Sequence, residues 1–311
     1  MAGAVVTTSL TGGPADRSAV DAPVAADECP PAPAGPRDPD FFDEPRDGVP
    51  DAVPQGATSA RLCPGNGHRL EVPPEALTLG VDRLVDAVNE LPVPEDGFAC
   101  TQELGYGYRL VLGYPDGDRY QVSGALYGCR LVIVGPDQRR GADDLLEEYA
   151  ALLRAQREGE GEGEGEGAPA TDAGPGPGKV RIIACDGPTR ASAVARPDEI
   201  EQAVLCVHTA DGARGTPVPA ADLHLLREDL RGELPRIAFR SCPDATQVSL
   251  VGLTARGERV ALGPVCGTWQ LQVPEPWGTT TWPRSWVPGP AARGVLDALV
   301  AQARRGSAQT P

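Results

Sequence analysis

The chain of 311 residues has few aromatic residues, a single lysine and two asparagines. Lys179 stands against 27 arginines, and aromatic residues make up only 5% of the chain. This usage is typical of a GC-rich genome and carries no information about function. The shortage of aromatic side chains does limit the apolar surface that a small domain can bury, so we expect the fold to need further stabilisation.

Basic residues form no stripe that could contact phosphate groups. The net charge is −16, and residues 1–58 and 158–178 together hold 13 of these negative charges. The remaining sequence is therefore almost neutral. Because nucleic-acid binding needs clustered Lys and Arg, we expect no nucleic-acid partner.

Long apolar runs are also missing. No run approaches the roughly 18 residues that a transmembrane helix needs, so we expect no transmembrane segment. The N-terminal sequence MAGAVVTTSLTGG has neither a charged n-region nor an apolar h-region, and no signal peptide is visible as written. Cys29 does not follow the small and apolar residues of a lipoprotein signal.

Composition divides the chain into two repeats and three polar segments. Residues 1–58 are rich in Pro, Asp, Ala and Gly without apolar periodicity and are expected to be disordered. Residues 158–178, beginning EGEGEGEGEG, predict a solvated linker, and residues 306–311 a disordered tail. The linker separates two similar α+β repeats, which we place at 59–157 and 179–305.

Each repeat shows the same order of signals. Apolar spacing of three and four predicts helices, and turn residues between alternating segments predict hairpins. In the first repeat these are a helix near 75–90, Leu91-Pro92, a hairpin over 108–122, a strand at 131–134 and a helix at 141–156. In the second they are a helix near 219–233, Leu234-Pro235, a hairpin over 248–262, a strand at 268–273 and a helix at 290–304. The pattern predicts two similar halves, each with helices packed on a small antiparallel sheet that contains a Cys-flanked hairpin.

Eight cysteines are placed in an orderly way around these elements. A zinc site needs cysteines at short spacing, whereas the nearest neighbours here are 21 residues apart. Free buried cysteines are the other alternative. Two cysteines that flank a hairpin can meet at disulfide distance, which favours the pairs Cys100–Cys129 and Cys242–Cys266. Elimination within each half then pairs Cys29 with Cys63 and Cys185 with Cys206. Disulfides imply an oxidising compartment.

Known catalytic and cofactor motifs are missing. The chain has no Gly-x-Ser-x-Gly elbow, phosphate loop or dinucleotide fingerprint. His68, His208 and His224 are its only histidines, and each is typical of a surface or packing residue. Acidic residues between Asp143 and Glu148 fit the polar face of a helix. Pro115–Asp118 fits a hairpin turn better than a calcium loop. We expect no cofactor, no metal and no enzymatic activity.

All four tryptophans lie in the second half of the chain. Trp277, Trp282 and Trp286 belong to a Trp-rich loop, residues 269–290, whose prolines and threonines have no counterpart of that length in the first half. Aromatic rings on a stiff loop make good anchors for sugars or a partner protein. The alternative is that they fold back and cap the sheet. The three tryptophans are the candidate binding residues.

The Cys-x-Leu/Val strands and Leu-Pro-ended helices resemble uncharacterised secreted or surface proteins of actinobacteria. The resemblance covers residues 59–157 and 179–305 and implies export without assigning an activity. The segment Cys100–Cys129 is also similar to subtilisin-inhibitor-like proteins, although Thr101-Gln102 stands where they have a reactive Cys-Pro segment.

Three function classes follow. The leading one is a non-enzymatic, secreted or cell-surface protein that binds an unknown protein or cell-wall component through the Trp-rich loop. A protease inhibitor would instead make its contacts around Thr101–Tyr108. An enzyme of unrecognised type would assemble its site from distant residues.

Overall fold

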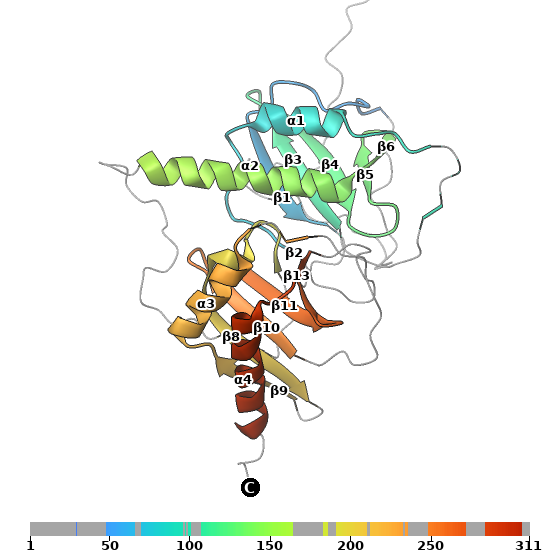
Figure 1. Ribbon diagram of the computed structural model, residues 1–311. Helices are drawn as coiled ribbons and strands as arrows, with labels where there is room; N and C mark the ends of the chain where they lie inside the picture. The colour runs from blue at the N-terminus through green and yellow to red at the C-terminus, as the bar shows by residue number, and fades with distance from the viewer. Residues whose placement is uncertain are drawn as a thin grey trace, which may run out of the picture.

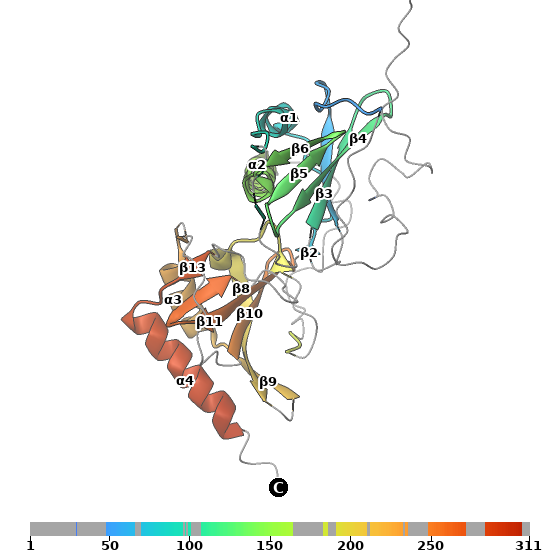
Figure 2. The same cartoon turned by 90° about the vertical axis from the view of Figure 1, so that its right-hand side faces the viewer.

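The computed structural model describes residues 29, 48–65, 70–95, 97, 99–100, 107–163, 183–185, 191–209, 212–232, 234–235, 248–271 and 284–306. Within these residues the chain forms four α-helices, two antiparallel sheets of five and six strands, and one short parallel strand pair. It is therefore an α+β protein. Figures 1 and 2 show that a pair of helices covers one face of each sheet.

The first unit is built from residues 48–163. Its elements are β1 (Ser59–Pro64), α1 (Val81–Asn89), β3 (Gly107–Gly113), β4 (Arg119–Ala125), β5 (Leu131–Val134), β6 (Asp137–Arg140) and α2 (Ala142–Gly163). The strands lie in the order β1-β3-β4-β5-β6, with every neighbouring pair antiparallel. Helices α1 and α2 contact each other above this sheet.

The second unit is built from residues 197–306. Its elements are η1 (Pro197–Glu199), β8 (Ile200–Thr209), β9 (Gly212–Pro217), α3 (Ala220–Leu230), β10 (Val248–Thr254), β11 (Arg259–Val265), β12 (Thr268–Leu271), β13 (Ser285–Trp286) and α4 (Pro290–Gly306). The sheet runs β13-β12-β11-β10-β8-β9, so β9 is an edge strand without a described counterpart in the first unit. Helices α3 and α4 contact each other, and α4 also contacts β8 and β9.

Both central hairpins close around a glycine in the left-handed region. In the first, Gly117 has a φ of 87°, and its N–H donates to the Tyr114 carbonyl at 3.0 Å. In the second, Gly257 has a φ of 79°, and its N–H donates to the Thr254 carbonyl at 2.8 Å. Only glycine adopts this conformation without strain, which is why the two turns were recognisable in the sequence.

Helix α1 begins at Val81, six residues later than the apolar spacing predicts. Leu77 is buried, but it pairs with Ala60 of β1 through two backbone hydrogen bonds of 2.8 and 2.9 Å. Gly80 then has a φ of 76°, which a right-handed helix does not contain. Leu77 therefore extends the sheet, and the expected helix over 75–80 is wrong.

Two predicted segment boundaries also differ from the structure. Helix α2 continues to Gly163, inside the predicted linker 158–178, because extending an existing helix costs far less than nucleating one. Residues 48–58 were expected to be disordered. Instead, Val53 is buried in the core of the first unit, and its backbone forms two hydrogen bonds with the Asn89 side chain.

Three disulfides are described: Cys29–Cys63, Cys100–Cys129 and Cys185–Cys206. They are the same pairs that the cysteine positions predict. Cys266 is disulfide-bonded too, whereas Cys242 lies outside the described residues, so the predicted pair Cys242–Cys266 is not placed.

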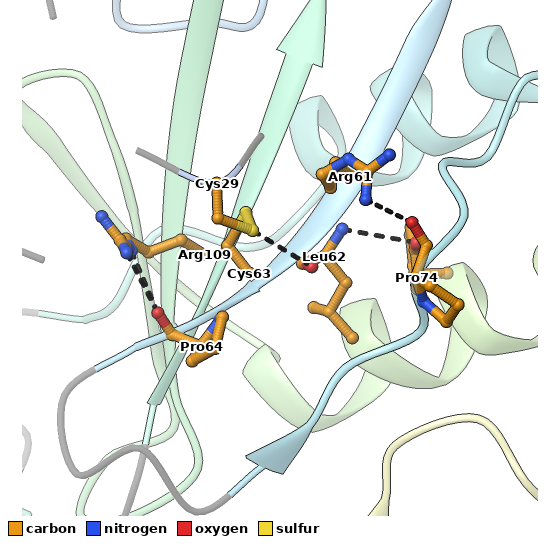
Figure 3. Close-up of a disulfide and its surroundings, with 8 residues drawn as sticks. Cys29, Arg61, Leu62, Cys63, Pro64, Pro74 and Arg109 are labelled. Atoms are coloured by element: carbon orange, nitrogen blue, oxygen red, sulfur yellow. Dashed lines mark hydrogen bonds between the residues drawn. A yellow bond between two sulfur atoms is a disulfide. The ribbon is translucent and has the colours of Figure 1, made fainter. Parts of the chain in front are cut away.

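The bridges Cys29–Cys63 and Cys185–Cys206 each join a preceding segment to a strand of the sheet, at corresponding register positions. Cys63 lies opposite Arg109 in the β1–β3 ladder, and Cys206 lies opposite Ser249 in the β8–β10 ladder. Both cysteines are fully buried. Figure 3 shows the first of them, where Arg109 also donates two hydrogen bonds to the Pro64 carbonyl at 3.1 and 3.2 Å.

A short parallel strand pair joins the two units. Strand β2 (Leu70–Glu71) pairs with β7 (Ala191–Ser192), which precedes the second unit in the chain. Two residues after β7, Val194 is completely buried and belongs to the core of the first unit. The Arg154 guanidinium of α2 donates to the Val194 carbonyl at 3.0 Å. The first core thus includes a residue from beyond the predicted linker.

A buried ion pair forms a second link between the units. The Arg157 guanidinium of α2 donates to both carboxylate oxygens of Glu258, at 3.0 and 3.1 Å. These side chains are 9% and 8% exposed. Glu75 binds the same guanidinium at 2.6 Å, and the Ser192 hydroxyl donates to Glu258 at 3.3 Å. Such bidentate Arg–carboxylate geometry is directional, so it fixes the second hairpin against α2.

Candidate functional site

The structure describes only part of the predicted Trp-rich loop, and the two tryptophans in that part, Trp269 and Trp286, are buried. Trp286 of β13 is 3% exposed, and its indole Nε1 donates to the Asp229 carboxylate at 2.8 Å. Its ring centroid lies 6.3 Å from that of Trp269, with the planes tilted by 55°. Trp286 is therefore not an exposed anchor, because its ring packs in the core and its polar atom is satisfied. Trp277 and Trp282 lie outside the described residues.

Asp229 links strand β13 to the start of α4 through two hydrogen bonds. Its carboxylate accepts hydrogen bonds from Trp286 and from the Gly289 backbone at 3.0 Å, immediately before α4. A Cβ added at Gly289 would lie 2.6 Å from Asp229 Oδ1, so the carboxylate would have to shift. This contact fixes the start of α4 relative to β13.

A groove of about 390 Å³ lies between α4 and the β11–β12 turn. Its volume falls within the range of ligand pockets, roughly 300–1,000 Å³. The apolar part of the lining comes from Val248, Pro264, Trp269, Pro288, Leu296 and Val300. Three charged side chains, Arg293, Asp297 and Arg304, line it from exposed positions on α4. The groove can therefore offer an apolar floor and a polar rim.

Local sequence explains how both sides of the groove are built. Residues 293, 297, 300 and 304 recur at spacings of three and four and so share one face of α4. On the opposite side, Cys266 and Gly267 have φ values of 52° and 80°, which reverse the chain between β11 and β12. The Thr268 hydroxyl donates to the Val265 carbonyl at 2.7 Å and holds this turn closed.

One residue that lines the groove, Val248, has a large aromatic counterpart at the same register position of the first unit. Leu110 pairs with Val122, and two positions further along this ladder Tyr108 pairs with Gly124. Leu250 pairs with Leu262, so the same step leads to Val248 and Pro264, both of which line the groove. Tyr108 is 1% exposed, and burial raises its pKa well above the usual value. In the first unit the Tyr108 ring fills the space above Gly124. In the second unit Val248 lines the groove instead.

Candidate enzymatic groups do not come together among the described residues. His208 Nε2 lies 3.4 Å from the Ser249 hydroxyl, but Ser249 is 6% exposed and faces the disulfide-bonded side of the sheet. The described residues contain no group of three or more His, Cys, Asp or Glu arranged to hold a metal ion. His224 is exposed near Glu228 at 3.9 Å, and His68 lies outside the described part.

The acidic residues of α2 form ion pairs with arginines. Glu147 binds Arg284 at 2.9 Å and Glu148 binds Arg83 at 2.7 Å. Arg284 belongs to the second unit, so the first of these pairs adds to the contacts between the units. These carboxylates lie on the polar face of α2, as predicted, and form partly exposed ion pairs.

The predicted inhibitor segment is mostly outside the described residues. Residues 101–106 are not described, and Tyr108 at its end is buried. In the described part of the chain, no helix is both long and apolar enough to span a membrane.

Apart from Trp269 and Pro288, which belong to the predicted Trp-rich loop, the groove residues carry no motif that predicts binding. One signal was present: when the two hairpins are aligned on Gly117 and Gly257, Tyr108 falls opposite Val248. Comparison of the chain with family models, curated proteins and solved structures found no match.

Proposed function

We propose that this chain is a non-enzymatic binding or interaction protein that acts outside the cytoplasm and binds its partner in the groove beside α4. One observation carries the proposal: where Tyr108 fills the first unit, the second has Val248 at the floor of an open groove with a polar rim. Protein interiors are close-packed. The groove is open to solvent and has the volume of a ligand pocket, so we propose an external occupant for it.

We also propose that the two units descend from one duplicated motif. The order β1-β3-β4-β5-β6 corresponds to β8-β10-β11-β12-β13, and Cys63 and Cys206 hold the same register. In both units the proline carbonyl of a Leu-Pro pair accepts a hydrogen bond from the last strand of the sheet. Duplication leaves one copy free to acquire a ligand site while the other keeps a closed core.

The disulfides support the extracytoplasmic part of the proposal. The six cysteines of the three described bridges are oxidised, which is consistent with secretion or display at the cell surface. Counting alkylatable thiols in protein from its natural source tests this part. A protein with eight free thiols would rule it out.

The binding proposal is tested by screening ¹⁵N-labelled full-length protein against short peptides, cell-wall fragments and small molecules. We expect saturable shifts of groove residues such as Gly267, Thr268 and Val300. Amides at the matching place in the first unit, such as Gly124 and Leu131, provide the internal control and should not move. A screen in which no ligand of any class shifts the groove would contradict the proposal.

A further inference from the structure

The filled position in the first unit indicates what the groove can hold. The Tyr108 ring lies over Gly124, where an added Cβ would collide with it. Its hydroxyl donates to the Ala142 carbonyl in the first turn of α2 at 2.7 Å. One aromatic side chain therefore bridges the sheet and the start of the second helix.

The second unit has no ring at this register position, and its groove is lined along α4 from Arg293 to Arg304. Val248 replaces the tyrosine and is too short to reach from β10 to α4. Helix α4 also lies against β8 and β9, away from the β11–β12 turn. The space left between Val248, Pro264 and Leu296 is part of the groove.

We infer that the groove binds an aromatic side chain of a partner polypeptide. This inference rests on the proposed function and names its ligand. Trp269, 8% exposed, lines the groove and offers an aromatic contact that an aliphatic side chain cannot reproduce. Pro264 and Pro288 add rigid apolar surface. The exposed Arg293 and Asp297 at the rim supply a donor and an acceptor for the main chain that carries the ring.

The first test compares two probes that differ only in side chain. N-acetyltyrosinamide and N-acetylleucinamide are titrated into ¹⁵N-labelled full-length protein. The aromatic pair contact predicts that the tyrosine probe binds about two- to tenfold more tightly. Its shifts should centre on Gly267, Thr268 and the α4 residues that face them.

Two variants block the groove in different ways. Val248→Tyr combined with Pro264→Gly copies the Tyr108–Gly124 pair and should remove binding while keeping or raising the melting temperature. Val300→Trp fills the groove from a half-buried position on α4, so it serves if the double variant fails to fold. Val287→Trp is the matched control, because Val287 is 56% exposed and does not line the groove. It should bind like the wild type.

The possible outcomes separate the inference from the function on which it rests. Equal affinity for the two probes overturns the aromatic inference but leaves a binding groove. Absence of binding by every probe and by the broader screen removes both. A further result would overturn the inference: the wild type binds no probe, but the variant with Trp277→Ala and Trp282→Ala does. The chain's own tryptophan rings would then occupy the groove.

Discussion

The two units solve the same packing problem with different aromatic residues. All six tyrosines of the chain lie between residues 106 and 149, and all four tryptophans lie between 269 and 286. Tyr108, Tyr120 and Tyr149 are completely or almost completely buried in the first unit. In the second, Trp269 and Trp286 pack against each other, and the groove lies beside Trp269, between α4 and the β11–β12 turn. Five strands of each sheet follow a corresponding order, but different aromatic side chains pack between sheet and helices.

Removing the disulfide that anchors each sheet should have the largest effect. Replacing both cysteines of Cys29–Cys63 by alanine should cost roughly 3–4 kcal/mol of unfolding free energy in the chain-entropy model. Cys185–Cys206 closes a loop of 21 residues instead of 34, so its removal should cost about 0.4 kcal/mol less. Urea unfolding of the two double variants measures this. A much larger loss for the shorter loop would break the comparison between the units.

The next effect concerns equivalent turn residues of the two hairpins. Glu258→Gln removes the charge that Arg157 binds and should cost about 1.5–3 kcal/mol, the usual contribution of a hydrogen bond to a charged group. Asp118→Asn is the matched control, because Asp118 is exposed at the same place in the first hairpin. It should stay within about 0.5 kcal/mol. Urea unfolding that gives both variants the same loss would show that the link between the units adds no stability.

The smallest effect is a dependence on alkaline pH that arises in the first unit. Burial raises the pKa of Tyr120 and of Tyr149 to about 12, and it also raises the pKa of Tyr108 well above its usual value. The unfolded chain ionises tyrosine near pH 10, so it loses protons that the folded chain keeps. Stability is then fully present below about pH 10 and falls as pH rises toward the folded pKa values.

Amide exchange can assign this loss to one unit. At about pH 10 the decrease should be smaller than that from Glu258→Gln, and Tyr120→Phe should reduce it. Tyr120 also donates a hydrogen bond to the Pro50 carbonyl, so the phenylalanine variant must be compared with itself at neutral pH. A loss that begins in the second unit would contradict the assignment.

Much of the fold was predictable because its signals are local. The Asp-Gly turn at 116–117 and the apolar spacing of α4 determine structure within a few residues. Leu77 was misassigned because its partner, Ala60, is 17 residues away in the chain and helical spacing cannot reveal such a contact. Strands β1, β6, β9 and β13 were missed for a related reason, since they are edge strands or short.

The candidate site was less predictable than the fold. Trp286 was a candidate binding residue, with capping of the sheet as the alternative. It is buried, and the contact that holds its indole is made to Asp229, which lies 57 residues away in the chain. The groove depends on the absence of a ring at Val248 and on where α4 lies across the sheet. No local sequence motif indicates either property. Both required the spatial comparison of the two units.

The burial of Val194 in the first core has a consequence for the order of folding. A chain emerging from a ribosome or an export channel can form β1, α1 and the β3–β6 strands early. It cannot complete that hydrophobic cluster, or pair Leu70 with Ala191, until the residues after the predicted linker have emerged. The final closure of the N-terminal half therefore waits for the beginning of the C-terminal half. Stopping synthesis before residue 191 would leave an incomplete core with an unpaired strand, a state that is prone to aggregation.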